Sequence, residues 1–249
     1  MFRTLLVDDN LQFRAALHDA LHARFPFCEV SGADGVQSGL DKALRLRPNL
    51  IIVDLALIDG SGLELIRRLR AMRVASPIVA LTIHELPEYR DEALRSGADH
   101  YFAKFPTSVR DIYRYVDGLL ACRLRALVIC GDAALGEALG TILDSRCPDM
   151  VSVRTEMLED GVLNGRALNP QLVLFHSGDD ADRETLYCQA LRIAWRDNRA
   201  RIVCVRNAER PSLPTGVDHV LTRAQDFENH LVRIVEGVRA EHFPRPIES

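Results

Sequence analysis

The first clear pattern in the chain is a short apolar run that ends in a carboxylate, Leu50–Asp54. Four branched apolar side chains precede Asp54 without the alternation of a half-exposed strand. Such a run is typical of a parallel strand buried on both faces. Pro48 and Asn49 end the preceding helix and open this strand. Because ligands of open α/β sheets bind beyond the carboxyl ends of the strands, Asp54 is a candidate functional residue.

A short apolar strand followed by an amphipathic helix occurs five times in the first half of the chain. The pattern predicts strands at 4–7, 28–33, 50–54, 77–81 and 100–103. It predicts helices at 11–24, 35–46, 63–72, 87–96 and 107–123. Asn10 is a suitable N-cap for the first helix. Consecutive strand–helix units of this kind predict a doubly wound parallel sheet with helices on both faces.

From Arg125 the same pattern starts again, which indicates an internal repeat of domain size. Strands are predicted at 126–130, 151–154, 172–176 and 201–205, with a last one after Gly216. Helices are predicted at 135–144, 157–168, 181–195 and 227–241. The second of these is expected to be poor and broken by Gly161 and Gly165. Pro211 and Pro214 leave room for one helical turn at most between 207 and 216.

We therefore predict two flavodoxin-like (βα)5 domains in tandem, with the second lacking most of its fourth helix. Their predicted bounds are 1–122 and 123–242, and a loose tail follows at 243–249. The length of 249 residues fits two domains of ordinary size.

Composition narrows the range of functions. The net charge is −4 with acidic and basic residues interspersed, so we expect no binding of nucleic acid. No apolar run reaches the roughly 18 residues of a membrane helix, and the N-terminus enters a strand without a signal peptide. The six cysteines form no CxxC pair and are interpreted as buried residues of a reducing cytosol. The expected location is therefore cytoplasmic, with no membrane partner.

Chemically reactive side chains follow the predicted strands of the first half. Asp8 and Asp9 follow the first strand, Asp54 ends the third, Thr82 follows the fourth and Lys104 follows the fifth. Carboxylates gathered in a low-dielectric cleft repel one another unless a cation lies between them, and oxygen ligands suit Mg2+. A hydroxyl and an ammonium beside Asp54 would suit an incoming phosphoryl group.

Lysine is rare in this chain, and that makes Lys104 stand out. Of the 31 basic residues, only Lys42 and Lys104 are lysines, and the others are arginines. The ammonium of lysine is a compact point charge, whereas the guanidinium of arginine is planar and forked. Lys104 is therefore a candidate for a site where arginine would not serve.

These residues resemble the receiver domain of bacterial two-component response regulators, over about residues 1–122. The resemblance implies that Asp8, Asp9, Asp54 and the backbone carbonyl of Ala56 hold Mg2+. It implies that Asp54 accepts a phosphoryl group from a sensor kinase histidine. Thr82 would hydrogen-bond the phosphoryl oxygens.

Further positions follow the pattern of that family. Lys104 would pair with the carboxylate and then with the phosphate, and Tyr101 would be the aromatic that moves inward with Thr82. Gly62 is the family's usual glycine beyond the acceptor. Ala56 and His84 occupy the two positions that tune how long the phosphate lasts.

Two positions depart from the family pattern. Ile58 stands where the family usually has proline, which affects the loop after the acceptor. The usual Lys-Pro pair is replaced by Lys104-Phe105-Pro106, so either the usual cis peptide is kept before Phe105 or the loop is rebuilt.

The second half resembles a receiver whose chemistry has been lost. Overlaying the two halves puts Gly131 at Asp8, Asp132 at Asp9 and His176 at Asp54. The same overlay pairs further positions of the two halves: Arg206 with Thr82, Val220 with Tyr101, and Arg223 with Lys104. Such a pocket would repel Mg2+ and form no acyl phosphate. The arginines are expected to pair with Asp132, and binding of an anion is the alternative. We expect an inactive pseudo-receiver.

The leading hypothesis is a response regulator that signals through protein contacts and has no DNA-binding output. Expected partners are a sensor histidine kinase or phosphotransfer protein, a downstream protein target and, as a candidate, a second copy of the chain. An alternative is a phosphate sink or adaptor in a phosphorelay. A small α/β flavin enzyme or phosphatase is disfavoured, because the loop after the first strand lacks the required motifs. The chain is not expected to be a dedicated enzyme.

Overall fold

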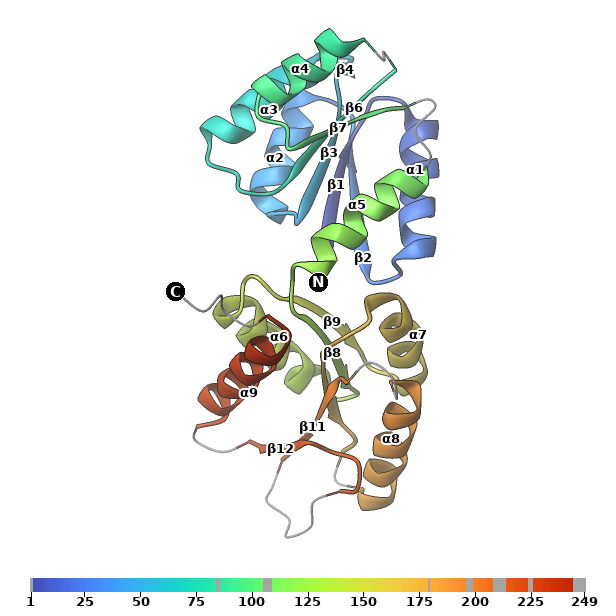
Figure 1. Ribbon diagram of the computed structural model, residues 1–249, viewed down its shortest axis with the longest axis vertical. Helices are drawn as coiled ribbons and strands as arrows, with labels where there is room; N and C mark the ends of the chain where they lie inside the picture. The colour runs from blue at the N-terminus through green and yellow to red at the C-terminus, as the bar shows by residue number, and fades with distance from the viewer. Residues whose placement is uncertain are drawn as a thin grey trace, which may run out of the picture. The chain divides into compact units, whose positions relative to one another are not determined.

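The computed structural model describes residues 2–83, 86–104, 109–178, 180–195, 199–207, 214–223 and 226–243. The chain forms two compact units, which divide between Asp117 and Gly118 (Figure 1). The domain boundary at residue 122 remains a prediction. Within the described ranges, no helix is both long enough and apolar enough to span a membrane.

The first unit is a five-stranded parallel sheet covered by helices on both faces. Its strands are β1 (Phe2–Val7), β2 (Cys28–Ala33), β3 (Leu50–Asp54), β6 (Ile78–Thr82) and β7 (His100–Ala103). Its helices are α1 (Leu11–Arg24), α2 (Val36–Leu46), α3 (Gly62–Ala71), α4 (Pro87–Arg95) and α5 (Val109–Ala121). The strand order β2-β1-β3-β6-β7 is the flavodoxin-like order. Helices α2, α3 and α4 lie on one face of the sheet, and α1 and α5 on the other (Figure 1).

A small hairpin adds to the predicted elements of the first unit. Strands β4 (Ala56–Leu57) and β5 (Gly60–Ser61) pair antiparallel directly after Asp54. The sequence predicted a turn cluster here, and the hairpin brings the start of α3 back against β3.

The second unit has the same architecture. Its strands are β8 (Arg125–Cys130), β9 (Val151–Thr155), β10 (Leu172–His176), β11 (Arg201–Arg206) and β12 (His219–Thr222). Its helices are α6 (Ala133–Arg146), α7 (Leu158–Leu168), α8 (Ala181–Ala194) and α9 (Phe227–His242). The order β9-β8-β10-β11-β12 repeats that of the first unit. The predicted loss of a fourth helix falls mostly on residues 208–213, which lie outside the described residues.

Both units contain the same set of hydrogen bonds between their third helix and the residues directly before their fifth strand. In the first unit, Arg70 Nε donates to Gly97 O at 2.8 Å and Nη2 to Asp99 Oδ2 at 2.6 Å. The Asp99 carboxylate also accepts the backbone N–H of Ile78 at 2.7 Å. The second unit repeats these bonds at 2.7 Å each, with Arg192, Gly216, Asp218 and Ile202. The repeat therefore extends from the sequence pattern to individual hydrogen bonds.

The prediction that Gly161 and Gly165 break helix α7 is wrong. The helix is continuous from Leu158 to Leu168. A Cβ on Gly165 would lie 2.1 Å from Cζ2 of Trp195, and one on Gly161 would lie 2.6 Å from Cδ1 of Ile129. The glycines let α7 pack closely on its neighbours, and that packing outweighs their low helix propensity.

We predict that Gly165→Ala destabilises the second unit by about 1–3 kcal/mol, because the added methyl overpacks the contact with Trp195. The matched control is Gly237→Ala in α9, where a Cβ meets nothing within 4 Å. That control is expected to stabilise by about 0.5–1 kcal/mol. Urea unfolding followed by circular dichroism measures both changes, and stabilisation by Gly165→Ala would contradict the packing argument.

Candidate functional site

The candidate site lies at the carboxyl edge of the first sheet. Neighbouring strands β1 and β3 pair Val7 with Val53, so the residues that follow them, Asp8 and Asp54, are brought side by side. Asp8 is 3% exposed and Asp54 is 5% exposed, whereas Asp9 is exposed. One carboxylate oxygen of each lies within 4.8 Å of the other two. The edge therefore gathers three oxygen ligands from sequence positions 46 residues apart.

Lys104 bridges two of these carboxylates. Its Nζ lies 2.7 Å from Asp8 Oδ2 and 2.7 Å from Asp54 Oδ2. The side chain is 6% exposed, so these ion pairs are shielded from water. The backbone N–H of Lys104 donates to Thr82 O at 2.6 Å, which fixes the end of β7 against β6.

Among the residues that the structure describes at this site, two buried carboxylates lie beside one ammonium, so their charges are unbalanced. Burial raises the pKa of Asp54 above its usual value and nearby Asp8 adds to the rise, although Lys104 opposes it. Burial alone would lower the pKa of Lys104, but the hydrogen bonds and charges of Asp54 and Asp8 outweigh it and raise that pKa. Both groups therefore hold their protons more tightly than usual, and the surplus negative charge favours a second cation.

Further predicted residues of the first unit lie on the strands and loops of this sheet. Thr82 ends β6 and is 2% exposed, and Tyr101 packs partly buried against the core. The Ala56 N–H donates to Asp54 Oδ1 at 3.3 Å. A Cβ on Gly62 would lie 2.0 Å from Asp54 O, so only glycine fits there.

Some predicted positions add nothing to this geometry. Ile58 is 84% exposed on the loop after Asp54. His84, Phe105 and Pro106 lie outside the described residues, and so does the peptide bond between Lys104 and Phe105.

The donor set fits a small hard cation. Asp8, Asp9 and Asp54 offer carboxylate oxygens, the ligand type that Mg2+ prefers, and one of them faces solvent, where Mg2+ can keep its waters. These three residues would hold the ion. Bound Mg2+ would supply positive charge that offsets the carboxylates and the oxygens of a phosphoryl group.

With this geometry in place, comparison with known proteins identifies the fold. Residues 4–117 match the sequence profile of the response regulator receiver domain. They are a receiver domain. The receiver domain accounts for β1 through most of α5, so the predicted resemblance is confirmed for this part of the chain.

Two curated relatives match the receiver domain. The transcriptional regulatory protein TrcR of Mycobacterium tuberculosis is 34% identical over 118 residues, which cover 47% of this chain and 45% of TrcR. The KDP operon transcriptional regulatory protein KdpE of Escherichia coli is 38% identical over 104 residues, covering 42% and 45%. The chain thus spans about half the length of the curated relatives it matches.

A solved structure also aligns with this half of the chain. It is a CheY-like response regulator receiver domain protein from Methanospirillum hungatei, with 28% identity and a TM-score of 0.44. The alignment covers 47% of this chain and 92% of that one.

The second unit corrects the predicted overlay of the two halves by one residue. Strands β8 and β10 pair Cys130 with His176, so Cys130 rather than Gly131 stands where Asp8 stands in the receiver domain. Gly131 then takes the place of Asp9. Asp132 takes the place of Asn10, and its side chain caps α6 by accepting the N–H of Leu135 at 3.0 Å. In this register no carboxylate remains at the metal positions.

The buried arginine of the second unit also has a different partner from the one predicted. Arg206 donates through Nε to Glu184 Oε2 at 2.9 Å, rather than pairing with Asp132. Arg206 is 4% exposed and Glu184 is 3% exposed. Glu184 lies in the first turn of α8, eight residues after His176, as Gly62 lies eight residues after Asp54. That spacing was the available signal for Glu184, and the sequence argument missed it.

The other residues of the second edge keep the positions of their counterparts. The backbone N–H of Arg223 donates to Arg206 O at 2.9 Å, which repeats the bond from Lys104 to Thr82. Val220 pairs with Cys204 as Tyr101 pairs with Ala80. His176 is 6% exposed, and its Nδ1 lies 2.8 Å from Val205 O.

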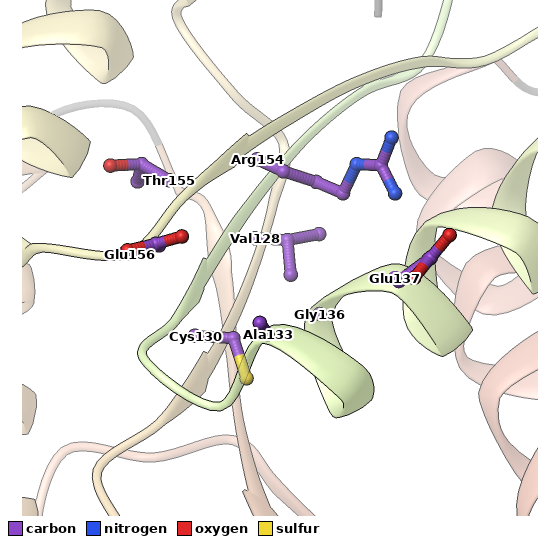
Figure 2. A pocket seen from close by; sticks show the side chains of 8 residues that line it. All are labelled: Val128, Cys130, Ala133, Gly136, Glu137, Arg154, Thr155 and Glu156. Carbon is purple, nitrogen blue, oxygen red and sulfur yellow. The ribbon is translucent and has the colours of Figure 1, made fainter.

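A hollow of about 320 Å³ lies between β8, β9 and α6 in the second unit (Figure 2). In the receiver domain, Arg14 of α1 packs across Gly32 of β2 in the equivalent place. The second unit reverses the two residues: Arg154 comes from the strand, and Gly136 faces it from the helix. Figure 2 shows Arg154 extending towards α6, where it packs over Gly140. The space beside Gly136 therefore stays open.

Proposed function

We propose that Asp54 accepts a phosphoryl group from the histidine of a sensor kinase or phosphotransfer protein. The observation that carries this proposal is the bridge from Lys104 to Asp54 and Asp8, at the edge where three carboxylates meet. The carboxylate oxygen of Asp54 attacks phosphorus, the bond from phosphorus to the donor nitrogen breaks, and an acyl phosphate forms. Lys104 and Thr82 stand beside Asp54 to meet the new phosphoryl oxygens.

Roles for the surrounding residues follow from this proposal. Asp8, Asp9, Asp54 and the carbonyl of Ala56 would hold Mg2+. Tyr101 would respond to the movement of Thr82, and Ala56 and His84 would tune the lifetime of the phosphate. Small Ala56 beside the acceptor leaves room for water, which favours a short lifetime.

We further propose that the second unit is a receiver-like module that takes no phosphoryl group and passes the signal on by protein contacts. Its strand order and its Arg192–Asp218 ion pair, which repeats Arg70–Asp99, support the receiver-like assignment. The loss of carboxylates at the Cys130 and Gly131 positions, with His176 at the acceptor position, supports the absence of phosphorylation. The names of TrcR and KdpE describe transcriptional regulation. DNA binding by this chain is therefore the alternative output, and a phosphate sink is the alternative role.

The full chain incubated with acetyl phosphate and Mg2+ should gain one phosphoryl group, as measured by intact mass. Asp54→Asn should lose this gain completely, because the amide oxygen is not a competent nucleophile. Asp59→Asn is a matched control outside the site and should be labelled normally. A second phosphoryl group, or labelling that persists in Asp54→Asn, would refute the assignment.

A further inference from the structure

The Lys104 ammonium has an aromatic neighbour as well as its carboxylates. Its Nζ lies over the Phe13 ring, 4.5 Å from the centroid. A cation in this position is attracted by the negative face of the ring, more strongly when water is excluded. The Lys104 side chain is 6% exposed. Lys104 also lines an apolar hollow of about 100 Å³, together with Phe13, Leu81, Ala103 and Ile112 among others.

The position of Phe13 is fixed by the candidate site itself. Asp8 Oδ1 accepts the N–H of Asn10 at 2.9 Å, and Asn10 Oδ1 accepts the N–H of Phe13 at 3.0 Å. These two bonds fix the position of the first turn of α1 relative to the Asp8 carboxylate. The ring of Phe13 is therefore held at a defined place relative to the group that Lys104 bridges.

The second unit gives an internal comparison. Its helix cap is the same, with Asp132 accepting the N–H of Leu135. Leu135 therefore stands at the place of Phe13, and Arg223 stands at the place of Lys104. The aromatic ring and the lysine are both absent in the unit that has lost the acidic site.

We propose that Phe13 is a positioning residue that holds the Lys104 ammonium against Asp54, a role that rests on the proposed function of Asp54. Lysine has a flexible four-carbon stem and a point charge, so two carboxylates alone fix its direction poorly. The ring adds a third attractive group to the two carboxylates. Lys104 is then already in place when the phosphoryl group arrives.

Fluorinated phenylalanines at position 13 test this role, because fluorine withdraws charge from the ring face and changes its shape little. The rate of Asp54 phosphorylation by acetyl phosphate should fall stepwise from one to three fluorines, by about fivefold in total. The same series at Phe2, which is fully buried in β1, should leave the rate unchanged. A rate that ignores fluorination at position 13 would overturn the proposal, even with Asp54 phosphorylated.

A second measurement does not depend on phosphorylation. With lysine labelled by carbon-13 at Cε, the full chain gives two side-chain signals, from Lys42 and Lys104. The signal of Lys104 should carry a ring-current shift that Phe13→Leu removes and Phe13→Tyr keeps, while that of Lys42 stays constant. If the chain takes no phosphoryl group, the proposed function fails and this measurement decides the positioning alone. A Lys104 signal indifferent to Phe13→Leu overturns it.

Discussion

Replacement of Glu184 with glutamine is expected to lower the unfolding free energy of the second unit by about 3–5 kcal/mol. Glu184 and Arg206 are both almost fully buried and form a direct ion pair. Removing the carboxylate takes the Glu184 charge away from a guanidinium buried in the core, and arginine cannot lose its proton to escape the cost. Urea unfolding followed by the fluorescence of Trp195, the one tryptophan of the chain, measures this unit selectively.

The same substitution at Glu228 is the matched control. Glu228 pairs with Arg146 at 2.6 Å, but both side chains are about half exposed, so its loss should cost less than about 1 kcal/mol. Adding Arg206→Met to Glu184→Gln should recover much of the lost stability, because the buried guanidinium is then gone. Equal costs at Glu184 and Glu228 would show that burial does not govern this pair.

This buried pair also shows what the sequence pattern could and could not predict. The strand ends were predictable, because apolar runs such as Leu50–Asp54 define them and parallel strands share one carboxyl edge. That argument gathered Asp8, Asp54 and Lys104 correctly at one place. That argument did not find Glu184, because Glu184 lies on a helix. A single acidic residue in a helical sequence is usually part of the solvated face.

The register of the second half was missed for a related reason. An Asp in each half suggested that Asp132 matches Asp9, but the hydrogen bonds show that it matches the helix cap Asn10. The equal spacing of three residues from Asn10 to Phe13 and from Asp132 to Leu135 was a usable signal. Gly161 and Gly165 led to the wrong prediction of a broken helix. Helix propensity takes no account of tertiary neighbours such as Trp195, on which Gly165 packs closely.

Replacement of Lys104 with methionine is expected to destabilise the receiver domain by about 3 kcal/mol or more in the absence of Mg2+. Methionine keeps the length of the side chain but leaves Asp8 and Asp54 buried together without their shared counter-charge. The cost should be greatest at neutral and higher pH. Burial raises the pKa of Asp54, and in this variant Lys104 no longer opposes the rise, so protonation of Asp54 restores stability as the pH falls towards the ordinary value of about 3.9.

Mg2+ should reverse most of this loss, and this is the decisive part of the prediction. An ion that binds only the folded domain adds about 2.7 kcal/mol at a hundred times its Kd. In the native chain, Mg2+ must share Asp8 and Asp54 with Lys104, so its stabilising effect should be smaller there than in Lys104→Met. Lys42→Met, the only other lysine substitution available, should respond to Mg2+ as the native chain does, because Lys42 donates to the Gly32 carbonyl on β2. Calorimetric unfolding with and without Mg2+ measures the three proteins, with Trp195 fluorescence confirming an unchanged second unit. An equal response to Mg2+ in all three would mean that Lys104 and the metal do not compete for these carboxylates.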